Sequence, residues 1–152
     1  IAKVTGPDGE EIPQPEPERV RVVSEETART TVDMFRSAFQ SDPTGMQSGT
    51  AQNAGLEGYQ LSGKTGTAQK VNPDTGAYSN SAFWITFAGI APANDPRFVV
   101  AVMLDEPQRG PLEGGAGGQS VAPVFTQIAS WLLNRENIPP SPHAEPFLLQ
   151  AQ

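Results

Sequence analysis

The sequence predicts an α+β fold in which helices pack on an antiparallel sheet. Three β-rich segments follow one another between residues 59 and 105, and the turn sequences that join them are short enough for hairpins. An apolar stripe with helical spacing lies on either side of this region, in residues 25–39 and in residues 120–135. The order turn, helix, three adjacent strands, helix therefore indicates one sheet covered by helices.

Residues 25–39 are predicted to form the first helix. Ser24 is a suitable N-cap, and two glutamates follow it in the first turn, where the helix dipole favours carboxylates. The apolar positions share one face at i, i+4, i+7 and i+11. They are Ala28, Val32, Phe35 and Phe39. A Ser-Asp-Pro-Thr-Gly sequence at residues 41–45 then ends the helix.

The strand candidates are residues 59–71, 83–91 and 97–105. The sequence Asn-Pro-Asp-Thr-Gly at residues 72–76 predicts a tight turn between the first two, and residues 92–96 join the last two as a hairpin. The third segment is an almost unbroken run of β-formers. It is therefore expected to be a central strand that is buried on both faces.

The second helix is expected to follow a glycine-rich loop over residues 108–119. Ser120 is its predicted N-cap, Pro123 is tolerated in its first turn, and the helix ends near Arg135. Its predicted apolar face consists of Val121, Val124, Phe125, Ile128 and Leu132. Trp84 and Trp131 are expected to be core or sheet-covering aromatic residues.

Three regions follow from the distribution of proline. Residues 1–18 are interpreted as an N-terminal turn and a Pro-rich connector, residues 19–135 as the folded part, and residues 136–152 as a Pro-rich tail. Prolines are sparse over most of the folded part, and Pro92 and Pro96 mark the turn between its last two strands. We therefore expect a folded unit with loose ends.

Composition excludes several classes of function. The net charge is −7, whereas nucleic-acid binding needs a basic face, so no nucleic acid is expected as a partner. The sequence has no cysteine and a single histidine, His143, which lies in the tail. Thiolate catalysis, a Cys- or His-ligated metal and a Ser-His-Asp triad are therefore not expected, and we predict no cofactor. No apolar run approaches the roughly 20 residues of a membrane span.

The most informative stretch is Gly-Tyr-Gln-Leu-Ser-Gly-Lys-Thr-Gly-Thr-Ala at residues 58–68. Its first part, residues 58–65, matches the spacing of a phosphate-binding P-loop. A P-loop needs a buried strand before it and a helix that starts at the Lys-Thr pair. The preceding residues are not a buried strand, and Gly66 and Pro73 leave no room for a helix. A P-loop NTPase therefore stays only as a remote alternative.

The second interpretation takes residues 64–66 as the Lys-Thr-Gly box of serine penicillin-recognising enzymes, a box that lies on a strand. Three further segments are typical of class B penicillin-binding proteins. They are Phe-Ala-Gly-Ile-Ala-Pro at residues 87–92, Asp-Pro-Arg at residues 95–97, and a Gly-Gly pair that leads into Ala-Pro-Val-Phe at residues 122–125. Over roughly residues 1–135 the chain resembles the C-terminal part of a class B penicillin-binding protein, a peptidoglycan D,D-transpeptidase. It is most similar to the division-specific (septal) branch, with an actinobacterial character in the tail.

This resemblance implies a fold and a role for each residue of the box. The fold is that of the penicillin-binding proteins and serine β-lactamases, incomplete in this chain. The hydroxyls of Thr65 and Thr67 bind the terminal carboxylate of the D-Ala-D-Ala stem peptide or of a β-lactam, and Gly66 lets the ligand backbone approach. The N–H of Thr67 is one of two oxyanion-hole donors. The ammonium of Lys64 lies beside the serine of the family's middle motif and assists proton transfer.

Two residues are secondary candidates at the rim of the site. The strand edge at Gln69 can pair with an extended peptide as an added strand. Tyr59 is expected to pack at the start of the strand, with a role at the rim as the alternative. In many relatives a Tyr-Tyr pair walls the site, and Gly115 and Ala116 stand in its place here.

Two of the three boxes of the family are absent. No serine of this sequence begins a Ser-x-x-Lys or a Ser-x-Asn motif, and both boxes lie upstream of the Lys-Thr-Gly strand in the family. We therefore expect a C-terminal fragment of a split, cleaved or internally unresolved transpeptidase, inactive alone. We expect the remainder of the transpeptidase as a partner. It holds the nucleophilic serine and lies on another chain or on an omitted segment. A penicillin-binding-like sensor domain without turnover is the alternative.

The resemblance also implies ligands, partners and a location. The ligands are the peptidoglycan stem peptide and β-lactams, and the partners are membrane proteins of the division complex. The location is the extracytoplasmic face of the cell membrane, with the membrane anchor outside this sequence.

Overall fold

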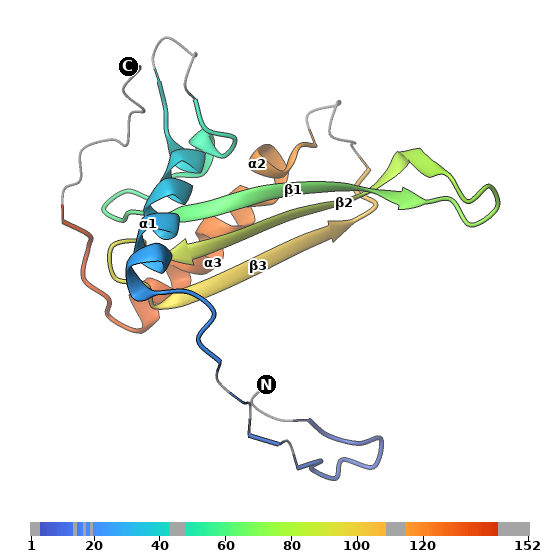
Figure 1. Ribbon diagram of the computed structural model, residues 1–152, viewed down its shortest axis with the longest axis horizontal. Coiled ribbons are helices and arrows are strands. Elements are labelled where there is room, and N and C mark those ends of the chain that lie inside the picture. The colour runs from blue at the N-terminus through green and yellow to red at the C-terminus, as the bar shows by residue number, and fades with distance from the viewer. Residues whose placement is uncertain are drawn as a thin grey trace.

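The described part of the chain contains three strands and the helices around them (Figure 1). The computed structural model describes residues 4–13, 15–16, 18, 20–42, 48–108 and 115–142. The elements are α1 (Glu25–Phe35), the 3-10 helices η1 (Arg36–Phe39) and η2 (Gln52–Ala54), β1 (Ser62–Val71), β2 (Tyr78–Ala91), β3 (Phe98–Asp105), α2 (Gly117–Ser120) and α3 (Ala122–Arg135). The strands form one antiparallel sheet in the order β1-β2-β3. The predicted α+β class is confirmed.

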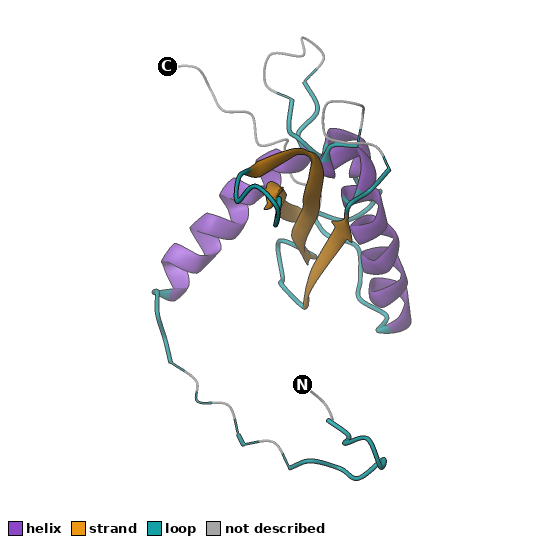
Figure 2. Cartoon of the chain, turned by 90° about the vertical axis from the view of Figure 1, so that its right-hand side faces the viewer, coloured by secondary structure: helices purple, strands orange, loops and turns teal. Residues whose placement is uncertain are grey.

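The core lies between the sheet and α3. Figure 2 shows α1 and α3 on opposite sides of the sheet. Phe87 of β2 and Phe125 of α3 are fully buried, and their ring centroids are 5.1 Å apart. Gly89 leaves room for this contact, because a Cβ there would meet the ring of Phe125. Phe39 of η1 completes an aromatic cluster, with its ring centroid 5.7 Å from that of Phe87.

The first helix begins where the sequence predicts and ends earlier. The hydroxyl of Ser24 accepts a hydrogen bond from the backbone N–H of Thr27 at 3.1 Å, which confirms the N-cap. The α-helix ends at Phe35, and the chain continues as the 3-10 helix η1. No residue of α1 is buried among the described residues, so most of the predicted apolar stripe has no core to pack into.

The prediction that the third strand is central and buried on both faces is wrong. Within the described sheet, β2 is the central strand and β3 pairs only with β2. The side chains of β3 alternate between partly buried and exposed, and Val99 and Met103 on the open face are 76% and 61% exposed. The apolar run therefore reflects one face that packs on the core and one face that the described residues leave bare.

The hairpin between β1 and β2 is longer than predicted. β2 begins at Tyr78, ahead of the expected residue 83, so this hairpin projects beyond the end of β3 (Figure 1). The predicted turn is confirmed, because the side-chain Oδ1 of Asn72 accepts a hydrogen bond from the N–H of Asp74 at 2.8 Å. The connection between β2 and β3 also lies where the sequence predicts it.

The second helix forms with a different start and a different buried face. A short helix, α2, precedes it, so the hydroxyl of Ser120 lies within a helical turn and donates to the carbonyls of Gly115 and Ala116, at 3.0 Å each. Ser120 is therefore not the N-cap of α3. The buried residues of α3 are Ala122, Phe125, Ala129 and Leu133. Val124 and Ile128, which were predicted to face the core, are 38% and 37% exposed.

Some predictions fall outside this description. His143 and residues 109–114 of the glycine-rich loop lie outside the described residues. The boundaries of the three regions, 1–18, 19–135 and 136–152, stay predictions.

Candidate active site on strand β1

The Lys-Thr-Gly-Thr sequence lies in the middle of β1, an edge strand of the described sheet. Thr65 is paired with the buried Phe87, and Thr67 with the buried Ile85. Directly paired residues share a face of an antiparallel sheet, so both threonines project toward the side that carries the core. Lys64 belongs to the opposite face. A strand here, in place of a helix that starts at the Lys-Thr pair, excludes the P-loop alternative.

Glycines allow β1 to run closely beside β2. A Cβ at Gly63 would overlap the ring of Phe87, and a Cβ at Gly66 would overlap the hydroxyl of Thr86. The bare backbone at Gly66 therefore has a structural cause in this sheet. It also leaves the face of β1 that carries Lys64 without a side chain at this point.

Lys64 is exposed and has no acidic partner among the described residues. Its Nζ donates to the carbonyl oxygen of Thr65 at 2.8 Å, and none of the ion pairs within the described part of the chain involves it. The hydroxyl of Thr65 donates to the hydroxyl of Thr50 at 3.2 Å, whereas Thr67 is exposed. An ammonium and two hydroxyls thus gather along a short stretch of one strand.

Lys70, the next lysine of β1, is held differently. Its Nζ lies 2.5 Å from Oε1 of Glu106 and 2.9 Å from Oδ1 of Asp105, and it sits 5.4 Å from the ring centroid of Trp84. The hydrogen bond to Glu106, followed by the one to Asp105, raises the pKa of Lys70 above its usual value. The charge of Lys70 is therefore largely compensated, and that of Lys64 is not.

The two rim candidates each contact a neighbouring segment. The hydroxyl of Tyr59 donates to the carbonyl of Ile138 at 2.7 Å, just beyond α3, and the amide of Gln69 donates to the carbonyl of Ser79 at 3.0 Å. Tyr59 also packs against the core cluster, as the packing interpretation predicts. The rim roles stay predictions.

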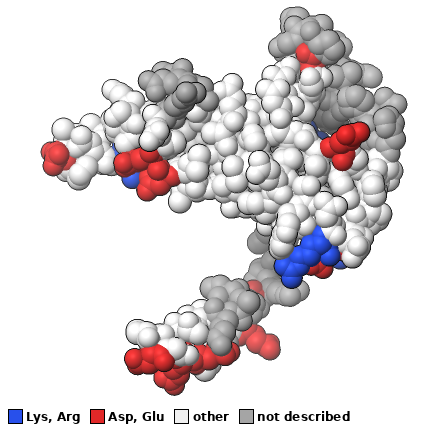
Figure 3. Space-filling view, turned by 180° about the vertical axis from the view of Figure 1, so that it is seen from behind, with Lys and Arg blue, Asp and Glu red and all other residues white. Residues whose placement is uncertain are grey.

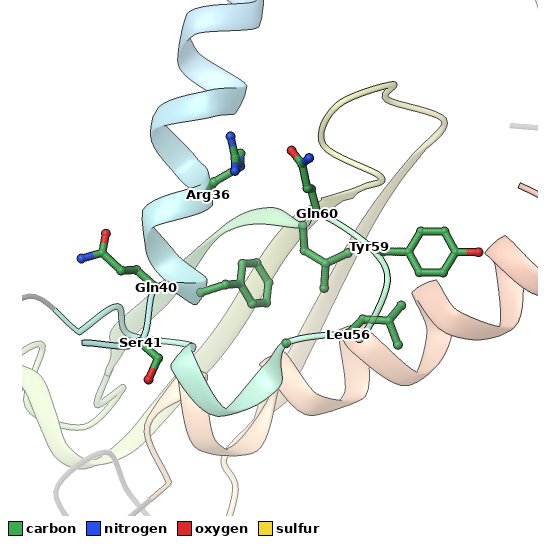
Figure 4. A pocket seen from close by; sticks show the side chains of 9 residues that line it. Arg36, Gln40, Ser41, Leu56, Tyr59 and Gln60 are labelled. Atoms are coloured by element: carbon green, nitrogen blue, oxygen red, sulfur yellow. The ribbon is translucent and has the colours of Figure 1, made fainter. Parts of the chain in front are cut away.

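A cavity of about 340 Å³ lies before β1, between η1 and the segment around Tyr59 (Figure 4). Figure 4 shows Arg36 and Gln40 on the side of η1 and Leu56 on the opposite side. The lining ends at Leu61, so this cavity is separate from the Lys-Thr-Gly-Thr stretch.

Sequence reasoning missed Thr50 and the first residues of α2. Thr50 lies in a stretch that reads as a polar loop, yet its hydroxyl contacts Thr65. Gly117 lies so close that a Cβ there would be 3.4 Å from Cβ of Thr65. No local sequence pattern predicts either contact, because both arise only when segments that are separate in the sequence fold together.

Two further features concern the described residues as a whole. No helix within the described ranges has the length and apolar character needed to cross a membrane. The same ranges contain no group of three or more His, Asp and Glu side chains that would hold a metal ion.

Comparisons with known proteins place the chain among transpeptidases. Residues 3–130 match the family described as "Penicillin binding protein transpeptidase domain". The chain is 53% identical over 152 residues to Penicillin-binding protein PbpB of Mycolicibacterium smegmatis. This match covers 99% of this chain and 23% of that protein. It is 41% identical over 120 residues to Peptidoglycan D,D-transpeptidase FtsI of Escherichia coli. That match covers 79% of this chain and 18% of the relative.

Solved structures of similar proteins share the fold of this chain. The crystal structure of penicillin binding protein 3 from Mycobacterium tuberculosis, complexed with ampicillin, superposes with a TM-score of 0.80 at 50% identity and covers 100% of this chain and 33% of that chain. The same protein complexed with aztreonam gives a TM-score of 0.77 at 49% identity, with 100% and 33% coverage. The chain thus spans less than a quarter of these curated relatives and a third of the solved chains.

Proposed function

The chain belongs to the class B penicillin-binding protein transpeptidases, and from this premise we propose that it supplies the Lys-Thr-Gly-Thr strand of a septal D,D-transpeptidase. The enzyme crosslinks peptidoglycan stem peptides through a serine ester, and β-lactams acylate the same serine. The observation that carries the proposal is the position of residues 64–67 on an edge strand of the described sheet, where no carboxylate of the described residues pairs with the ammonium of Lys64.

The substrate carboxylate is bound by the hydroxyls of Thr65 and Thr67. Both threonines project from the same face of β1, and Gly66 between them lets the ligand backbone approach. The backbone N–H of Thr67 donates to the oxyanion that forms when the serine attacks. Loss of one such donor typically costs about 3–4 kcal/mol of transition-state stabilisation.

Lys64 lies beside a serine of the second, missing box of the family. Its ammonium raises the local electrostatic potential and assists proton transfer during acylation. Because no carboxylate pairs with Lys64 in the described part of the chain, its charge is available for this role. The rim roles of Gln69 and Tyr59 belong to the same proposal.

The nucleophilic serine lies on residues outside this sequence, because the sequence contains neither Ser-x-x-Lys nor Ser-x-Asn. Uncovered apolar surfaces support a missing remainder. Val99 and Met103 project from the open face of β3, and Trp131 of α3 is 58% exposed. Figure 3 shows the side that carries α3, where charged residues lie mostly at the margins of a wide uncharged area. The remainder of the transpeptidase covers such surfaces and is the first partner.

Ligands and location follow from the same reaction. The related penicillin binding protein 3 was crystallised with ampicillin and with aztreonam, and we propose that β-lactams acylate the protein that contains this chain. Peptidoglycan is crosslinked outside the cytoplasmic membrane. The proposed location is therefore the extracytoplasmic face of the cell membrane, with an anchor outside this sequence and membrane proteins of the division complex as partners.

Turnover distinguishes the transpeptidase from a sensor that only binds. The full-length protein that contains this chain is expected to release many equivalents of product from a thioester analogue of the D-Ala-D-Ala peptide. A D-amino acid should be incorporated as acceptor, and prior acylation by benzylpenicillin should abolish the release. Formation of a single acyl-enzyme equivalent without further release would favour the sensor. Nucleotide binding with magnesium is not expected.

A further inference from the structure

The hydroxyl of Thr50 contacts the substrate-binding strand from a separate segment. We propose that Thr50 is a positioning residue, which holds the hydroxyl of Thr65 in the orientation that receives the carboxylate of the stem peptide or of a β-lactam. This inference rests on the proposed function and extends it to a residue that no motif of the chain includes.

The two hydroxyls form a short chain of hydrogen bonds. Oγ1 of Thr65 donates to Oγ1 of Thr50 at 3.2 Å. A hydroxyl has one hydrogen and two lone pairs, and its hydrogen rotates to suit its partners. When a carboxylate binds, Thr65 donates to it, and Thr50 turns its own hydrogen toward Thr65. The contact between the two oxygens is kept, and each bond polarises the next.

The backbone on either side of Thr50 is fixed to η1. The N–H of Gly49 donates to the carbonyl of Gln40 at 2.8 Å, and the N–H of Ala51 donates to the carbonyl of Ala38 at 2.7 Å. Ala51 is 1% exposed. The segment that carries Thr50 therefore has little freedom to move relative to the core.

The start of α2 holds the same segment from the other side. The carbonyl of Thr50 occupies the space where a side chain of Gly118 would lie. Gly117 packs against Thr65, and a Cβ on it would be 3.0 Å from the carbonyl oxygen of Thr86. Thr50, α2 and β1 are thus fitted together at the threonine of the box.

The fold itself does not require the hydroxyl of Thr50. The residue is exposed, and among the described residues the only hydrogen bond of its hydroxyl is the one to Thr65. Valine has nearly the same shape without the hydroxyl and is equally stiff at χ1. A Thr50→Val change therefore removes the hydrogen bond and leaves the packing.

The test is the rate at which a carboxylate-bearing penicillin acylates the full-length protein. Thr50→Val is expected to lower the second-order acylation rate about fivefold, the loss of one net hydrogen bond, with an unchanged melting temperature. The loss should lie in the affinity of the non-covalent complex more than in the acylation step. Thr50→Ser keeps the hydroxyl and should restore the rate. Thr31→Val is the control, because within the described part of the chain the hydroxyl of Thr31 bonds only inside α1, to the carbonyl of Thr27.

A double-mutant cycle with Thr65→Val shows whether Thr50 acts through Thr65. If it does, Thr50→Val has no further effect once the hydroxyl of Thr65 is gone. Additive effects, or a wild-type rate in Thr50→Val, would overturn the inference while the proposed function stands. Failure of the wild-type protein to be acylated at all would overturn the proposed function and this inference with it.

Discussion

Replacement of Lys64 by alanine in the full-length protein slows acylation by β-lactams about 10²- to 10⁴-fold, the usual contribution of a positioned proton-transfer group. The expected size follows from the environment of the ammonium. Among the described residues it bonds only to the carbonyl of Thr65, so its charge and protons are available to an adjacent serine. Lys64→Arg keeps the charge and changes the shape of the donor, so it should recover only part of the rate.

Lys70→Ala is the matched control for this experiment. It removes the same charge from the same strand, but Lys70 is engaged by Asp105 and Glu106. The acylation rate of Lys70→Ala should stay close to that of the wild type. An unchanged rate in Lys64→Ala, measured by stopped-flow acylation, would remove the role proposed for this residue. A loss of equal size in both variants would mean that only the net charge matters.

Replacement of Gly118 by alanine destabilises the full-length protein by about 1–3 kcal/mol, as overpacking of a close contact does. A Cβ at this position would overlap the backbone carbonyl of Thr50, which cannot rotate away as a flexible side chain does. Either α2 or the segment of Thr50 must move, so acylation should slow as well. Denaturant-induced unfolding gives the free energy, and acylation by penicillin gives the second effect.

Gly55→Ala is the control for Gly118→Ala. Apart from its two chain neighbours, no described residue has an atom within 4 Å of the place where a Cβ at Gly55 would lie, and the residue has a φ of −63°, which alanine adopts without strain. Its free energy of unfolding should change by less than about 0.5 kcal/mol. Equal stabilities of the two variants would show that the contact between α2 and Thr50 is not tight in solution.

Local sequence patterns predicted the parts of the fold that local chemistry decides. The cap at Ser24 and the turn at Asn72 depend on side chains that bond to their own neighbouring backbone, so a short window of sequence contains the whole cause. The hairpins followed from turn residues of the same kind. These features, together with the resemblance around residues 64–67, located the candidate site on a strand.

The errors concern features that only packing decides. An apolar run such as that of β3 indicates burial, but it does not say whether the second face is covered by residues of this sequence. The face of α3 was assigned from spacing alone, whereas the sheet selects the residues opposite Phe87. The contact between Thr50 and Thr65 joins two segments through the fold, and no periodicity contains it.

Covalent labelling with a fluorescent penicillin tests the central claim most directly. The 152-residue chain on its own should give no labelled band on a denaturing gel, because it contains neither the Ser-x-x-Lys nor the Ser-x-Asn box. The full-length protein that joins it to the serine-bearing segment should give a band that unlabelled benzylpenicillin suppresses. A labelled band from the chain alone, or no band from the full-length protein, would contradict the account.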